Sequence, residues 1–194
     1  MWIQGILEIY FERPREPLAK GGITWLDEKS FSKPALWTHS HDSNLDVKPT
    51  NKDILLTRNS VEAIFSFCYK HPRINGGVGN LNRENIRKKT LQLKKILEKW
   101  KPLAAIEIKY ENFLREESAM KEIKKISEHL KTPFDEQKAK DCYRKLEKKE
   151  TLVKKANETR GRWHDSILLK KTYNQEREKF KKEWSNFIIS ELSN

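Results

Sequence analysis

Residues 53–69 read DILLTRNSVEAIFSFCY, and this stretch decides the fold. It opens with a continuous apolar run, residues 54–56, which indicates a strand that is buried on both faces. Arg58 follows the run, and an apolar-periodic segment begins directly after it. Ser60 is placed to cap that segment as a helix, with Glu62 favourable in the first turn. The stretch therefore predicts a buried strand that passes directly into a helix.

The rest of the chain repeats this alternation of strands and helices. Two more strands are predicted, PALWTH at 34–39 and LAAIEIKY at 103–110. Apolar residues at helical spacing predict helices at the following ranges: 2–11, 82–101, 112–131, 134–150 and about 173–192. Residues 18–33 and 71–80 read as loops with glycine breakers. This order predicts an α/β fold with a parallel sheet flanked by helices, in one domain that spans 1–194.

The composition favours a folded, soluble chain. Of its 194 residues, 36% are hydrophobic and 35% are charged, and 6 Trp, 8 Phe and 5 Tyr argue against disorder. No apolar run is long enough to span a membrane, and MWIQGILEIYFERP lacks the features of a signal peptide. Cys68 and Cys142 lack metal-ligand spacing, so no metal is expected. A reducing compartment is the simpler inference, and a disulfide stays open. We therefore expect a cytoplasmic protein.

The net charge of +12, with a pI near 9.6, makes an anionic partner the natural expectation. Nucleotides, nucleic acids, sulfated glycans and membrane surfaces all belong to this class. The alternative is that much of this charge is lysine on solvated helix faces. The net charge alone therefore does not identify which anionic partner the protein binds.

Polar side chains follow all three predicted strands, where an open parallel sheet binds its ligands. They are Thr38 and His39, then Arg58, then Tyr110 and Glu111. We expect a ligand site along this edge of the sheet.

Arg58 and Ser66 are the most informative pair at this edge. They are eight residues apart, about two helical turns if the helix begins near Ser60. A phosphate beside the helix start would accept two hydrogen bonds from the arginine and one from the serine hydroxyl. The positive end of the helix dipole would also attract it. The alternative is an arginine that caps a strand end and a serine that bonds back to its own helix. The spacing is compatible with both interpretations.

Four segments, in order, resemble the sulfotransferase family. TRNSVEAIFSFCYK resembles its 3′-phosphate-binding segment, a strand ending in Arg and a helix carrying Ser, and KPALWTHSHD resembles its strand ending in Thr-His. The stretch IEIKYENFLREESAMKEIKKISEHLKTPFDEQKAK resembles a strand followed by a "YE" motif and a long helix. TRGRWHD resembles its late Gly-x-Trp loop. The resemblance covers most of residues 34–165.

This resemblance implies a P-loop-like α/β fold and the donor PAPS (3′-phosphoadenosine 5′-phosphosulfate). The implied reaction is transfer of the sulfuryl group to a hydroxyl or amine acceptor, with PAP as the product. Arg58 and Ser66 would hold the 3′-phosphate, and Tyr110 would lie near the adenine. Further phosphate contacts would come from the late loop, through Arg160, Gly161 and Arg162.

The resemblance also implies a general base and a loop anchor. His39 falls where cytosolic members keep the histidine that accepts the acceptor proton. His41 would serve instead if the register differs. Trp163 would anchor the late loop, although a core tryptophan fits the sequence equally well.

The family's first strand and its 5′-phosphosulfate-binding loop have no counterpart in the sequence. KGGITW at 20–25 and GGVGN at 76–80 lie in the wrong context for that loop, and residues 1–14 resemble the helix that follows it. We therefore expect a truncated or degenerate member, or a miscalled start, with weak nucleotide binding and poor catalysis. An exposed slot in the sheet would favour self-association or a partner that fills it.

The strongest alternative is a basic nucleic-acid-binding or scaffold protein without catalysis. Its helices would face phosphates through paired lysines, giving salt-sensitive binding. These lysines are interleaved with glutamates, and no RRM-type stacking motif or zinc-ligand spacing is present. A nucleotide kinase would need a GxxxxGK[ST] loop, which is absent from the sequence. The lysines are 88, 89, 94, 95, 124, 125, 148, 149, 154 and 155.

Overall fold

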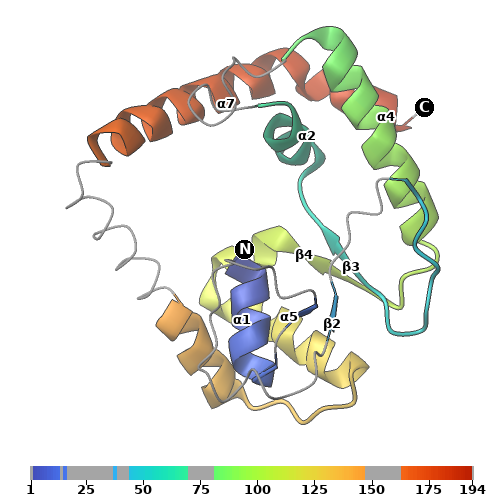
Figure 1. Cartoon of the computed structure of the whole chain (residues 1–194), viewed down its shortest axis with the longest axis vertical. Helices are drawn as coiled ribbons and strands as arrows, with labels where there is room; N and C mark the ends of the chain where they lie inside the picture. The colour runs from blue at the N-terminus through green and yellow to red at the C-terminus, as the bar shows by residue number, and fades with distance from the viewer. Residues whose placement is uncertain are drawn as a thin grey trace. The chain divides into compact units, whose positions relative to one another are not determined.

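The computed structural model is mostly helical, with a few short strands (Figure 1). It describes residues 2–13, 15–16, 37–38, 44–69, 81–146 and 163–193. The general α/β class that the sequence predicts is therefore present in the described residues. The chain divides into two compact units, Met1–His41 with Ile108–Asn157, and Asp42–Glu107 with Glu158–Asn194. The prediction of one domain over 1–194 stays a prediction.

The first unit packs helices around an apolar core and contains one small parallel sheet. Its elements are α1 (Trp2–Phe11), β1 (Arg15–Glu16), β2 (Trp37–Thr38), the 3-10 helix η2 (Tyr110–Leu114), α5 (Glu116–His129) and a helix at 136–146. Strands β1 and β2 are parallel, with Arg15 opposite Trp37 and Glu16 opposite Thr38. The core contains Ile6 and the apolar stripe of α5. The buried members of that stripe are Ala119, Met120, Ile123 and Ile126.

Tyr10 fixes α1 to the segment that precedes the helix at 136–146. Its hydroxyl donates to the Pro133 carbonyl at 3.4 Å and accepts from the Asp135 amide at 2.9 Å. At the surface, Lys138 forms an ion pair with Glu12 at 2.8 Å. The apolar face of α1 is therefore held by both burial and a bonded tyrosine.

The second unit contains residues 53–69, the predicted strand and helix joined at Arg58. Strand β3 (Ile54–Thr57) leads into α2 (Ser60–Cys68), which packs against α4 (Arg83–Trp100) and α7 (Trp163–Ser193). Strand β4 (Ile106–Lys109) pairs with β3. The Ala105 amide donates to the Asp53 carbonyl at 3.1 Å before the strands, and Thr57 Oγ1 donates to Glu107 Oε1 at 2.7 Å further on. The two strands therefore run in the same direction.

One aromatic cluster forms the core of the second unit. Phe65 of α2 is fully buried, with its ring 5.0 Å from Tyr69, 5.1 Å from Tyr173 and 5.2 Å from Phe180. The buried residues around it are Val61, Ile64, Cys68, Ile86 and Ile188. Dense aromatic packing of this kind contributes both area burial and ring–ring attraction. It fixes α2 against α4 and α7.

Both cysteines are buried free thiols, one in each unit. Burial raises the pKa of Cys68 to about 11, and burial also raises the pKa of Cys142. The disulfide that the sequence left open is therefore absent from the structure.

Strand β3 differs from the sequence prediction. None of its four residues is buried, and Leu56 is 45% exposed, so the prediction of burial on both faces is wrong. The reason is that β3 has a single neighbouring strand among the described residues, and an isolated two-stranded sheet leaves side chains in solvent.

Smaller differences concern where elements begin and end. Asn59, and not Ser60, caps α2: its side-chain oxygen accepts from the Glu62 amide at 3.1 Å. Strand β1 was not predicted, because two residues are too short for a pattern. Trp163, expected in a loop, is the first residue of α7. The stretches KGGITW and GGVGN lie outside the described residues.

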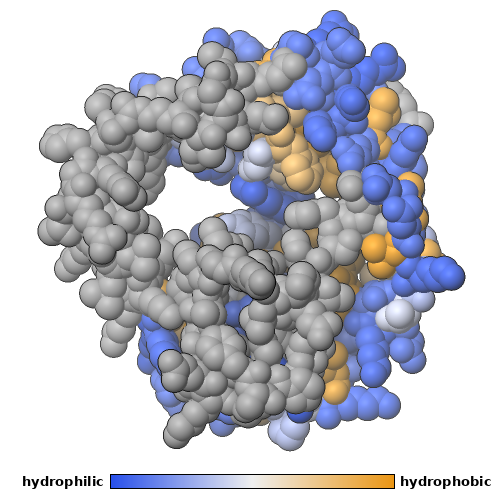
Figure 2. All heavy atoms as spheres, in the orientation of Figure 1, coloured by the Kyte–Doolittle hydropathy of each residue, from blue (hydrophilic) through white to orange (hydrophobic). Residues whose placement is uncertain are grey.

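The described surface is mostly hydrophilic on the face drawn in Figure 2, with separate hydrophobic areas. Within the described ranges, no helix is long and apolar enough to cross a membrane. The large apolar side chains that are exposed are Leu45, Val47, Leu56, Phe67, Leu91, Leu103, Leu114 and Ile189.

Phe65 and Phe67 offer a matched test of this core. Replacing Phe65 with Ala removes a fully buried ring, so we expect the free energy of unfolding to fall by about 3–5 kcal/mol. Phe67 is 46% exposed, and Phe67→Ala should cost far less. Urea unfolding of the two variants measures both values. Equal losses would contradict the described packing of α2.

Candidate functional site

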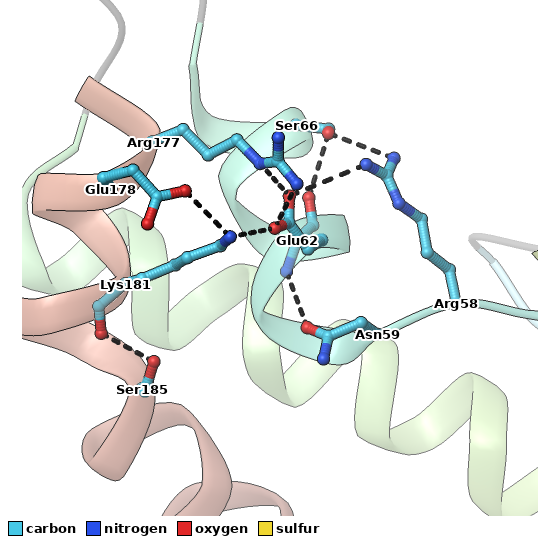
Figure 3. A network of polar contacts seen from close by, with 8 residues as sticks. All are labelled: Arg58, Asn59, Glu62, Ser66, Arg177, Glu178, Lys181 and Ser185. Carbon is cyan, nitrogen blue, oxygen red and sulfur yellow. Dashed lines mark hydrogen bonds and ion pairs between the residues drawn. The ribbon is translucent and has the colours of Figure 1, made fainter. Parts of the chain in front are cut away.

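Arg58 and Ser66, predicted to act together, do lie together. Arg58 directly follows β3, and Ser66 lies on α2. The Arg58 Nη1 atom donates to Ser66 Oγ at 3.3 Å (Figure 3). Both residues are solvent-exposed, so a ligand could reach them. The junction of β3 and α2 therefore places an arginine and a serine hydroxyl on one exposed surface.

The Ser66 hydroxyl also bonds back to its own helix. It donates to the Glu62 carbonyl at 2.9 Å while its oxygen accepts from Arg58. The serine that bonds back to its own helix, which was the alternative interpretation of the spacing, is therefore observed, and phosphate binding by the pair stays a prediction. A ligand that accepted from Ser66 would have to take over the proton that Glu62 now accepts.

The Glu62 carboxylate lies next to this pair and is the centre of an ion cluster. Arg177 of α7 donates two hydrogen bonds to it, from Nε to Oε2 at 2.5 Å and from Nη2 to Oε1 at 2.6 Å. Lys181, one turn further along α7, pairs with Oε1 at 2.7 Å. Arg58 Nη2 lies 3.8 Å from Oε2. Figure 3 shows the three cations converging on this carboxylate.

Charge pairing outweighs burial at Glu62. Its side chain is only 10% exposed. Burial by itself would raise the pKa of Glu62, but the hydrogen bonds from Arg177 and Lys181 lower it below its ordinary value. The same hydrogen bonds raise the pKa of Arg177 and of Lys181. All three groups are therefore charged at neutral pH.

The described structure does not test whether the other predicted site residues lie near this cluster. Tyr110 is half-buried at the start of η2, which belongs to the other compact unit. His39, His41, Arg160, Gly161 and Arg162 lie outside the described residues. Among the residues that the structure describes, no group of three His, Cys, Asp or Glu side chains could hold a metal ion.

Sequence reasoning missed Arg177 and Lys181. The signal was a pair of cations at i and i+4 on the C-terminal helix, which faces the acidic residue in the first turn of α2. In a helix rich in lysine and glutamate, the sequence offers no way to select this pair from its neighbours. Only the packing of α7 on α2 identifies it.

No family model, no curated protein and no solved structure matches the chain.

Glu62→Gln should destabilise the second unit. The change keeps the shape of the side chain but removes the negative charge that Arg58, Arg177 and Lys181 surround, so we expect the free energy of unfolding to fall by about 2 kcal/mol at pH 7. Because the folded-state pKa of Glu62 is lowered, its ionised form stabilises the protein above the ordinary carboxyl pKa. This contribution falls as the pH drops through the folded-state pKa. Denaturant unfolding at pH 7 and in acid measures both effects.

Glu128→Gln is the matched control for this change. Its carboxylate is 64% exposed and pairs with Lys124 at 3.9 Å, four residues earlier on α5. Exposed pairs of this kind contribute little, so the unfolding free energy should change by less than about 0.5 kcal/mol. A Glu62→Gln variant as stable as this control at pH 7 would contradict the role given to the cluster.

Proposed function

We propose that the chain is a sulfotransferase-like protein that holds the 3′-phosphate of PAPS between Arg58 and Ser66. The observation that carries this proposal is the convergence of these two side chains, 3.3 Å apart, on the exposed surface where β3 passes into α2. The proposed reaction is transfer of the sulfuryl group to a hydroxyl or amine acceptor.

The chemistry of the pair suits a phosphate dianion. A guanidinium offers several N–H donors in a planar fork, and the hydroxyl adds one more. The start of α2 lies beside Arg58 and contributes the positive end of a helix dipole. Exposure of both residues leaves room for a ligand on the solvent side.

The finer fold proposed here is a P-loop-like parallel sheet. Support comes from the parallel β1–β2 pair, from the common direction of β3 and β4 that their hydrogen bonds indicate, and from the direct passage of β3 into α2. In open parallel sheets, ligands bind beyond the carboxyl ends of the strands. Arg58 stands at such an end.

In the proposed reaction, the acceptor oxygen or nitrogen attacks the sulfur of PAPS. A new bond to sulfur forms as the bond between sulfur and the 5′-phosphate oxygen breaks. PAP leaves with that electron pair, and His39 accepts the acceptor proton. Tyr110 is proposed to contact the adenine, and Arg160, Gly161 and Arg162 to contact the phosphates.

The described lysines give the nucleic-acid alternative less support than the Arg58–Ser66 contact gives the sulfotransferase-like proposal. Several are paired with carboxylates on their own helices, as in Lys94 with Glu98, Lys124 with Glu128 and Lys140 with Glu136. Such pairing reduces the net positive charge of a helix face. Nucleic-acid binding is therefore the alternative outcome of the PAP-binding experiment.

The proposal predicts binding of PAP by the purified chain, measured as a thermal shift. A ligand at about one hundred times its Kd stabilises a protein by about 2.7 kcal/mol. AMP, which lacks the 3′-phosphate, should give a much smaller shift. Arg58→Ala should abolish the difference between the two nucleotides, because it removes the main donor to that phosphate.

Arg87→Ala is the matched control, since it removes the same charge from the same unit. Arg87 pairs with Glu191 at 3.4 Å. Glu191 lies fourteen residues after Arg177 on α7, about 21 Å along the helix axis. A PAP shift that survives Arg58→Ala, or that AMP reproduces, would overturn the proposal. Salt-sensitive binding of RNA or DNA with no PAP shift would favour the alternative.

His39 can be tested separately from binding. With PAPS and a panel of phenol, alcohol and amine acceptors, His39→Ala should lower the transfer rate by about 10²–10⁴-fold. PAP binding should change little, because the base acts on the acceptor. If the His39→Ala variant transfers sulfuryl groups at the unaltered rate, the base lies elsewhere, and His41→Ala is then compared.

A further inference from the structure

We propose that Arg177 and Lys181 of α7 are positioning residues for the phosphate site, because they hold the Glu62 carboxylate and thereby keep it from competing with the ligand for hydrogen bonds from Arg58. This inference rests on the proposed function of Arg58 and Ser66. It adds two residues that the sequence did not single out, and it gives the C-terminal helix a role in ligand affinity.

The hydrogen bonds around Glu62 carry the argument. Both carboxylate oxygens are bonded by α7, Oε2 by Arg177 Nε and Oε1 by Arg177 Nη2 and Lys181 Nζ. Arg58 stands further off, at 3.8 Å, and its Nη1 atom points to Ser66 instead (Figure 3). Arg58 is thus an ion-pair neighbour of Glu62, while the hydrogen bonds to that carboxylate come from α7.

A carboxylate beside Arg58 is an internal competitor for a phosphate. It carries the same sign of charge and accepts the same bidentate arginine fork. Its side chain is one-tenth exposed, so attraction to a nearby arginine is weakly screened. With the α7 cations present, the carboxylate is neutralised and held. Without them, Arg58 would be the remaining cation of the cluster to satisfy it.

The balance of charge in the cluster also indicates that the α7 cations favour phosphate binding. Among the residues that the structure describes, the contacts of this cluster join three cations, Arg58, Arg177 and Lys181, and two carboxylates, Glu62 and Glu178, the latter paired with Lys181 at 3.0 Å. Removing both α7 cations would leave one cation among two carboxylates. A phosphate would then meet net negative charge, and its affinity would fall.

Removal of these cations should leave α7 in place. The helix is also held by the aromatic cluster, where the rings of Phe180 and Phe65 are 5.2 Å apart, and by the buried Ile188. Buried apolar contacts of this kind supply most of the docking energy of a helix. The effect on ligand binding can therefore be measured in a folded protein.

The experiment is a double-mutant cycle, with PAP binding measured by isothermal titration calorimetry at fixed salt. Arg177→Gln/Lys181→Gln should weaken PAP binding about tenfold, within the range of coupling between groups in contact. Adding Glu62→Gln should restore most of that loss, because the competitor is then uncharged. Because a nearly buried carboxylate without partners also destabilises the fold, urea unfolding of the same variants separates the two roles. A loss of PAP affinity in a variant as stable as the unaltered chain supports positioning, and a loss that only follows the loss of stability contradicts it.

Lys179→Gln/Lys182→Gln is the matched control, because it removes two charges from exposed positions of the same helix. Its PAP affinity should fall far less. The inference is overturned if the Arg177/Lys181 variant binds PAP as the unaltered chain does, if Glu62→Gln fails to rescue it, or if the control loses as much. If the unaltered chain binds no PAP, the proposed function itself fails, and the inference fails with it.

Discussion

The Glu62 carboxylate is the polar group that links three elements of the second unit. It lies nearly buried at the first turn of α2, where a carboxylate without partners would be costly. Arg177 and Lys181 reach it from α7, more than one hundred residues later in the chain, and Arg58 approaches it from the end of β3. One charge therefore joins a strand end, a short helix and the C-terminal helix.

The apolar side of α2 makes that junction rigid. Val61, Ile64, Phe65 and Cys68 are buried, while Ser66 faces solvent. Because helix geometry fixes the angle between these side chains, packing of the buried face also sets where the Ser66 hydroxyl lies. The Asn59 cap fixes the start of the helix and so the place of Arg58 beside it. Packing and capping of α2 thus hold the two side chains in one arrangement, in which the Ser66 hydroxyl donates to the Glu62 carbonyl and accepts from Arg58.

The sequence predicted the helices well, because their apolar spacing is long and regular. The first helix was predicted at 2–11 and is observed as Trp2–Phe11, and 82–101 corresponds to Arg83–Trp100. The sequence predicted the places of β2, β3 and β4 but not β1, and it did not predict burial or limits: Leu56 is exposed, and residues 103–110 yield only Ile106–Lys109. Strand burial depends on neighbouring strands, which the pattern of one segment does not contain.

Within the candidate site, residues close together in sequence were predictable and distant ones were not. The spacing from Arg58 to Ser66 is local, and two turns of helix are enough to bring the pair together. The sequence of residues 53–69 therefore determined the strand, the helix and their shared exposed surface. The partners of Glu62 were decided only by tertiary structure, because many lysines and arginines of the chain are equivalent in sequence. The aromatic packing of α7 on α2 selects Arg177 and Lys181 from among them.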